Sequence, residues 1–209
     1  MIRTFFIVVT ACLSLPAFAQ TPEYIRADPA AIRSAFGPAV ASKIFSDAYT
    51  PMRRDMVQKS LQRVPGYTCG KEPLIAVAFV IPYPIKPGAV SWVERTFVDC
   101  QPRASQRNFL AIMEGSEPRM IELLPGNSET DPVLQRDAFS GSSAAVISAK
   151  PQNCDKQWVT DTRISGNRKP NEPWIEIWSY DLCGTKADVE MTFTPSATRG
   201  TTWSAKLKK

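Results

Sequence analysis

The segment Trp174-Ile175-Glu176-Ile177-Trp178, which lies between Cys154 and Cys183, decides the fold that the sequence predicts. β-Branched and aromatic residues dominate this segment, as is typical of a strand. A disulfide between the two cysteines would join it to the strand that precedes it. The same plan, two strands closed by a disulfide, is expected a second time between Cys69 and Cys100.

Five matches support this second copy, because they occur in the same order and at an offset of roughly 81 to 85 residues, as expected of a duplicated unit. The matched pairs are Thr50-Pro51-Met52 with Asp131-Pro132-Val133, Cys69-Gly70-Lys71 with Cys154-Asp155-Lys156, Trp92-Val93-Glu94 with Trp174-Ile175-Glu176, Asp99 with Asp181, and Cys100 with Cys183. The alternative interpretation is one irregular α+β domain.

The sequence therefore predicts an α+β fold of tandem duplicated units, each with a helix packed on a four-stranded antiparallel meander, and with extra N-terminal helices. The extra helices are expected at 29–48, after a lead-in without structure at 20–27. The helix of the first unit is expected at 51–64. The helix of the second unit is expected to begin at Asp131-Pro132 and to be interrupted at Ser140-Gly141-Ser142.

The strands are expected, in chain order, at 74–81, 90–100, 109–114, 120–124, 158–164, 174–183, 189–194 and 202–207. The predicted divisions of the chain are a signal peptide at 1–19, N-terminal helices plus the first unit at 20–128, and the second unit at 129–209.

The N-terminus has the pattern of a secretory signal peptide. Arg3 supplies a positive charge, residues 5–15 are mostly apolar, and Ala17-Phe18-Ala19 forms a small-x-small cleavage site. We expect cleavage after Ala19 and a periplasmic or secreted protein. The rival interpretation is a lipoprotein anchored at Cys12, which the short apolar run before this cysteine makes less favourable.

Removal of the signal peptide leaves four cysteines, and an even number in an exported chain favours disulfides. Three connectivities are possible, and the repeat selects Cys69–Cys100 and Cys154–Cys183. A zinc site is the competing use of four cysteines. No pair has CxxC spacing and the chain has no histidine, so no metal is expected.

The net charge of +5 is too small to indicate a nucleic-acid partner. Local basic spots at Arg168-Lys169 and at Lys206, Lys208 and Lys209 are typical of solvated surface. The more specific interpretation is that they bind an anionic envelope polymer. An envelope protein or such a polymer is the expected partner. No later run approaches the ~20 apolar residues that a membrane span requires.

The absence of histidine excludes Ser-His-Asp and Cys-His catalysis and histidine metal sites. No P-loop, GxGxxG or SxxK pattern is found, and no cofactor is expected. Carboxylates remain, because two acids alone can hydrolyse a glycoside. Glu94 and Glu176 are the pair that the repeat suggests.

Residues in a strand alternate between its faces, so Trp174, Glu176, Trp178 and Tyr180 share one face. A carboxylate flanked by two tryptophans resembles a sugar-binding surface. In this interpretation Glu176 is the acid of a carboxylate-dependent hydrolase. The simpler interpretation makes the aromatic residues core and pairs Glu176 with a neighbouring Arg or Lys.

A binding surface is the third interpretation, because large aromatic residues are typical interface anchors. Its candidate residues are Trp158, Trp174, Glu176, Trp178 and Tyr180. This surface requires the aromatic face to be free. If the helix covers that face, the residues form core instead, and the sequence leaves both possibilities open.

In layout, residues 50–209 resemble the secreted β-lactamase inhibitory proteins, in which two tandem helix-plus-four-strand units carry one disulfide each. The resemblance implies a protein-binding surface and assigns no individual residue. We therefore expect an exported cell-envelope binding, assembly or inhibitor-type protein without catalytic activity. A polysaccharide hydrolase and a purely structural envelope protein are the alternatives.

Overall fold

The computed structural model describes residues 25–26, 28–47, 49–63, 74–82, 90–99, 105–114, 117–196 and 200–208. In these ranges four α-helices accompany two antiparallel sheets, and the fold is α+β as predicted. Cys69 and Cys100 lie outside the described residues, and so does the signal peptide expected at 1–19.

Three helices precede the first long strand: α1 (Pro29–Phe36), α2 (Pro38–Ile44) and α3 (Tyr49–Gln62). The Asp28 carboxylate caps α1 by accepting hydrogen bonds from the amides of Ala30 and Ala31 at 2.9 and 3.0 Å. Gly37 joins α1 to α2 at a φ of 83°, which few residues other than glycine adopt. The extra N-terminal helices are therefore confirmed.

The first sheet contains β1 (Ile25–Arg26), β2 (Leu74–Pro82), β3 (Val90–Asp99), β4 (Ser105–Glu114) and β5 (Glu117–Glu122), hydrogen-bonded in that order. The expectation of an unstructured lead-in at 20–27 was wrong for Ile25–Arg26, which pairs with the outer edge of β2. A strand of two residues is too short to show a periodic pattern in the sequence. Its place is fixed instead by backbone pairing with β2, which lies far along the chain.

The second half contains α4 (Pro132–Ala145), a short 3₁₀ helix (Ile147–Ala149) and the strands β6 (Trp158–Ser165), β7 (Trp174–Leu182), β8 (Thr185–Ser196) and β9 (Gly200–Leu207). These strands form the second sheet in chain order. The predicted interruption at Ser140-Gly141-Ser142 was wrong, since α4 continues through it. A Cβ at Gly141 would overlap the indole ring of Trp203, so the glycine serves close packing of α4 on β9 rather than a break.

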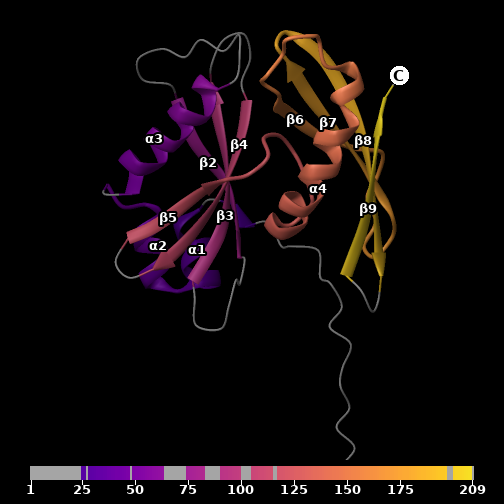
Figure 1. Ribbon diagram of the computed structural model, residues 1–209. Helices are drawn as coiled ribbons and strands as arrows, with labels where there is room; N and C mark the ends of the chain where they lie inside the picture. Colours follow the sequence, from indigo (N-terminus) through magenta and orange to yellow (C-terminus); the bar gives the residue numbers. More distant parts are fainter. Residues whose placement is uncertain are drawn as a thin grey trace, which may run out of the picture.

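The elements form four layers (Figure 1): α1–α3, the first sheet, α4, and the second sheet. Trp92 and Ala111 face the N-terminal helices, where they pack with Ile32, Ile44 and Tyr49. In the second half, Trp178, Tyr180 and Phe193 pack with Ala138 of α4. α4 packs on the second sheet, and other residues of the same helix line a groove together with residues of β4 and β5.

Candidate functional site

A groove of about 620 Å³ lies between the first sheet and the second half of the chain, and we call it the intersheet groove. It is lined by Ser60, Arg63, Arg107, Leu110, Ile121, Glu122, Leu123, Leu124, Pro125, Pro132, Val133, Gln135, Arg136, Phe139, Gln157, Trp158 and Val159. Its volume and mostly apolar lining are in the range of ligand-binding sites.

Helix geometry explains why α4 contributes to this lining. Ala138 and Ser142 lie on the side of α4 that is buried against the second sheet. Val133 and Phe139 line the groove together with Gln135, which is itself buried, so the groove-facing side of α4 lies next to its core-facing side. The side chains of Val133 and Phe139 are 48% and 40% exposed, which is unusual for large apolar residues of a helix between two sheets.

The first sheet supplies the opposite wall. Leu110 and Leu123 belong to an apolar cluster on the face of the sheet that is turned away from α1–α3. Ile121 of β5 lines the groove beside them and is 36% exposed. The groove is therefore apolar on both walls.

Several polar side chains that line the groove are hydrogen-bonded within the protein. Glu122 accepts hydrogen bonds from the hydroxyl of Ser60 and from Arg63, the latter at 2.9 Å. The Gln135 side chain accepts from the Leu124 amide at 3.0 Å and donates to the Thr130 carbonyl at 3.1 Å. These groups fix the walls of the groove rather than presenting free donors and acceptors to a ligand.

The five residues predicted as a binding surface separate into two places. Trp158, at the start of β6, is partly exposed and lines the intersheet groove. Trp174, Trp178 and Tyr180 are buried under α4, with exposed fractions of 6%, 0% and 0%. The structure thus resolves the alternative left open by the sequence: the helix covers this aromatic face, and its residues are core.

Glu176 is fully buried among those residues and accepts four hydrogen bonds. The indole nitrogens of Trp174 and Trp178 donate at 3.1 and 2.9 Å, and the Ser128 hydroxyl and the Glu129 amide each donate at 2.8 Å. None of these donors is an Arg or Lys side chain, so the predicted ion pairing of Glu176 was wrong. Four donors satisfy the buried carboxylate without a cation.

The segment between β5 and α4 is consequently held by both sheets. Arg95 of β3 donates to the Ser128 carbonyl at 2.6 Å, while the hydroxyl of the same serine donates to Glu176 of β7. The hydroxyl of Thr162 donates to the Pro125 carbonyl at 2.6 Å, and the Asn127 amide donates to the Thr162 carbonyl at 2.7 Å. These bonds fix the position of Pro125, which lines the intersheet groove.

Glu94 is buried at the corresponding position of the first sheet, but there an arginine pairs with the carboxylate. Nε of Arg53 lies 2.8 Å from Oε2 of Glu94, and Nη2 lies 3.1 Å from Oε1. The Trp92 indole donates to Glu94 at 2.9 Å. Burial, with the nearby Glu94 carboxylate, raises the pKa of Tyr49, so this phenol stays protonated beside the ion pair.

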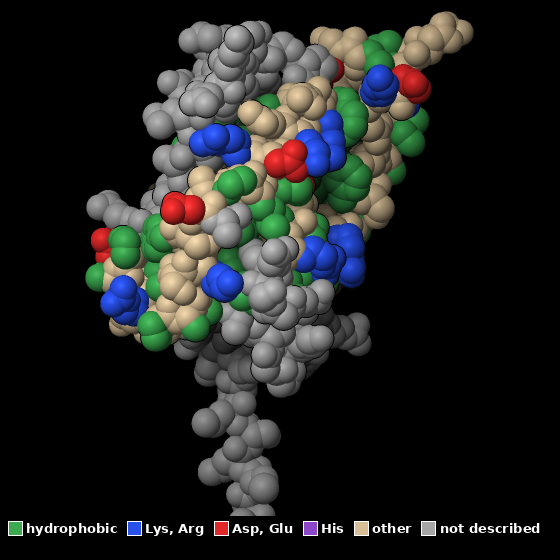
Figure 2. Space-filling view, turned by 90° about the vertical axis from the view of Figure 1, so that its left-hand side faces the viewer, with side chains coloured by type: hydrophobic (Ala, Val, Ile, Leu, Met, Phe, Trp, Pro, Cys, Tyr) green, Lys and Arg blue, Asp and Glu red, His purple; other side chains and the backbone are tan. Residues whose placement is uncertain are grey.

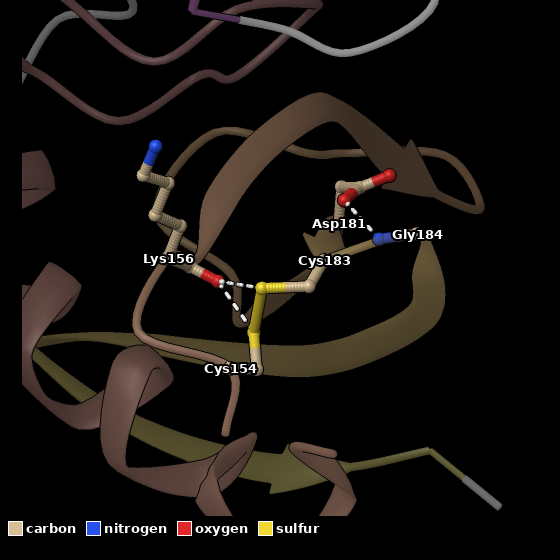
Figure 3. Close-up of a disulfide and its surroundings, with 5 residues drawn as sticks. All are labelled: Cys154, Lys156, Asp181, Cys183 and Gly184. Carbon is tan, nitrogen blue, oxygen red and sulfur yellow. Dashed lines mark hydrogen bonds between the residues drawn. A yellow bond between two sulfur atoms is a disulfide. The ribbon is translucent and has the colours of Figure 1, made fainter. Parts of the chain in front are cut away.

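The Cys154–Cys183 disulfide is present, as the sequence predicted. It lies at the β7–β8 hairpin turn (Figure 3), where Cys183 and Gly184 have φ angles of 56° and 94°. Asp181 accepts hydrogen bonds from the Gly184 amide at 2.8 Å and from Lys186. Although burial alone would raise the pKa of Asp181, these hydrogen bonds lower it below its usual value.

Within the described ranges, no three His, Cys, Asp or Glu side chains gather as metal ligands. On the side that Figure 2 shows, Lys and Arg side chains lie in separate places among apolar ones rather than as one basic face. Among the described helices, none combines the length and the apolar character needed to cross a membrane.

Sequence reasoning found Trp158 but missed the rest of the groove. Val133 and Phe139, apolar residues of α4 outside the stripe that contains Ala138 and Ser142, are the sequence signal that was available. The residues of β4 and β5 give no such signal, because buried and groove-lining apolar residues look alike in a strand.

Comparison of the chain with protein-family models, curated proteins and solved structures finds no match in any of the three. The resemblance in layout to the β-lactamase inhibitory proteins gains no support from these comparisons.

Proposed function

We propose that this chain is an exported binding protein of the bacterial cell envelope, without catalytic activity, that holds an apolar group of an envelope protein or envelope polymer in the intersheet groove. The observation that carries the proposal is the exposure of Ile121, Val133 and Phe139 around one groove, at 36%, 48% and 40%. Contiguous apolar surface of this kind is typical of a binding site. Trp158 is the member of the predicted aromatic set that remains available to a partner.

The alternative, a hydrolase with Glu176 as its acid, has no comparable support. Glu176 is 0% exposed, and protein groups donate to both of its oxygens. A glycosidic oxygen has to come within hydrogen-bonding distance of the acid. Such an approach requires removal of α4 or of the segment that contains Ser128 and Glu129.

We also propose that the two halves arose by duplication, with the boundary at 128/129. In both halves a helix precedes four strands that pair in chain order. Trp92 lies opposite Ala111, and Trp174, 82 residues later, lies opposite Phe193, which is also 82 residues beyond Ala111. In each half the indole nitrogen of this tryptophan donates to the glutamate two residues on.

Substitution of Val133 tests the groove directly. Val133→Glu places a charge on the apolar wall at a position exposed enough to leave the fold intact, so we expect at least a tenfold loss of affinity for the neutral apolar dye Nile red, measured by fluorescence. Ile147→Glu is the matched control, because Ile147 is 64% exposed and lies outside the groove lining. Equal affinities of the two variants would contradict the proposal.

Export is tested at the N-terminus. Sequencing of the protein recovered from a periplasmic fraction is expected to begin at Gln20, since signal peptidase cleaves after a small-x-small motif. A mature protein that retains Met1, or one that carries lipid on Cys12, would contradict it.

A further inference from the structure

We propose that the ligand of the intersheet groove is a single-chain amphiphile with an anionic headgroup, of the fatty-acid type. Its alkyl chain lies between the apolar walls, and its carboxylate lies beside the exposed side chain of Arg136. This inference rests on the proposed binding function and specifies the ligand class of the same site.

The apolar walls suit an alkyl chain. Most of the apolar lining residues are aliphatic, and they come from both halves of the chain. They are Leu110, Ile121, Leu123, Leu124, Pro125, Pro132, Val133 and Val159. Phe139 and Trp158 add two aromatic surfaces. Burial of an alkyl chain is driven by the area removed from water and requires no directional contacts.

The polar groups of the lining argue against a sugar or an extended peptide. Recognition of either ligand depends on several free hydrogen-bonding groups. Ser60, Glu122 and Gln135 are bonded to partners inside the protein. A ligand that requires few hydrogen bonds along its length therefore fits this groove better.

Charge complementarity selects the headgroup. Of the three arginines that line the groove, Arg63 pairs with Glu122 at 2.9 Å and Arg107 is 2% exposed, so Arg136 is the cation that a headgroup would meet. The Arg136 side chain is 76% exposed and contacts its neighbour Asp137 at 3.2 Å, an exposed pair of the kind that contributes little to stability. Arg136 is thus able to pair with an anion at the mouth of the groove.

A brominated fatty acid reports both whether the ligand binds and which tryptophan it contacts, because bromine quenches tryptophan fluorescence on contact. We expect 12-bromododecanoate, titrated below its micelle concentration, to quench part of the emission in a saturable manner. Trp158→Phe is expected to abolish this quenching, because Trp158 lines the groove. Trp92, Trp174 and Trp178 are at most 6% exposed, and Trp203 is partly exposed but packs on Gly141 of α4, outside the groove lining. Quenching that persists unchanged in Trp158→Phe would overturn the proposal.

Charge variants test the headgroup. Arg136→Gln is expected to weaken dodecanoate binding about 3- to 10-fold, whereas Arg54→Gln, an exposed substitution on α3 outside the groove, is expected to leave it unchanged. Dodecyltrimethylammonium, with the same chain and the opposite charge, is expected to bind more weakly than dodecanoate. Equal affinity for the two amphiphiles, or equal effects of the two variants, would overturn the assignment of an anionic headgroup.

Nile red separates this inference from the function on which it rests. Binding of Nile red in the groove without binding of dodecanoate would refute the amphiphile and leave the proposed function standing. Failure of both ligands to bind would refute both.

Discussion

At the scale of single residues, Glu94 and Glu176 show two ways to bury the same carboxylate. Both are fully buried two residues after a tryptophan whose indole nitrogen donates to them. Arg53 of α3 neutralises Glu94, whereas backbone and hydroxyl donors between β5 and α4 surround Glu176. Glu176 consequently ties the connection between the sheets to β7, a role that its counterpart does not have.

Glu176→Gln is expected to lower the free energy of unfolding by about 2–4 kcal/mol, because the new amide places a donor against indole and backbone N–H groups, which can only donate. Urea denaturation measures this loss. Glu172→Gln is the control, since the Glu172 side chain forms an exposed ion pair with Lys169 at 3.6 Å, and its effect is expected to stay within about 0.5 kcal/mol. Similar losses in both variants would show that the buried network does not stabilise the fold.

The sequence could not predict these hydrogen bonds at the residue scale. The alternation of residues along a strand is local, so the sequence predicted that Glu176 shares one face with Trp174, Trp178 and Tyr180. Their shared burial under α4 confirms this prediction. The donors Ser128 and Glu129 lie 48 and 47 residues away in the chain, and only the packing of α4 brings them to the carboxylate.

At the scale of elements, local chemistry explains the β7–β8 hairpin. Cys183 and Gly184 form a two-residue turn with positive φ at both positions, which matches the twist of the strands they join. Asp181 holds this turn through the Gly184 amide and Lys186, and the disulfide ties it to Cys154.

The lowered pKa of Asp181 predicts how the turn responds to acid. Its contribution to stability is fully present above the unfolded-state pKa of about 3.9 and is lost as the pH falls through the lower folded-state value. Asp181→Asn is therefore expected to cost about 1–2 kcal/mol at pH 7, and this difference is expected to shrink below about pH 4. Thermal unfolding followed from pH 7 to pH 2 measures it, and a difference that stays constant over this range would contradict the assignment.

The helix α4 shows where element-level patterns mislead. Ser140-Gly141-Ser142 favours a break, because glycine and serine are weak helix formers. Tertiary packing overrides that preference here, since only a residue without Cβ allows the ring of Trp203 to approach α4 so closely. Asp131, Pro132 and the first turn were predicted correctly, because capping depends on neighbours in sequence.

At the scale of the whole molecule, the chain builds two sheets and a groove that neither sheet forms alone. Strands that follow one another pair in both sheets, so their order could be predicted from the sequence. The groove could not, because its lining comes from α3, β4, β5, α4, β6 and the β5–α4 connection. The relative placement of the sheets depends on hydrogen bonds such as those of Ser128 and Thr162, which leave no periodic signal.

The most direct test of the binding site is amide chemical-shift mapping of the uniformly ¹⁵N-labelled protein with 1-octanol, a small uncharged apolar probe. We expect the shifted amides to cluster at the groove, around Leu123, Val133 and Phe139, and β9 to be unaffected. Shifts that gather on the outer helices α1–α3, or an absence of saturable shifts at these groove residues, would contradict the proposed binding site.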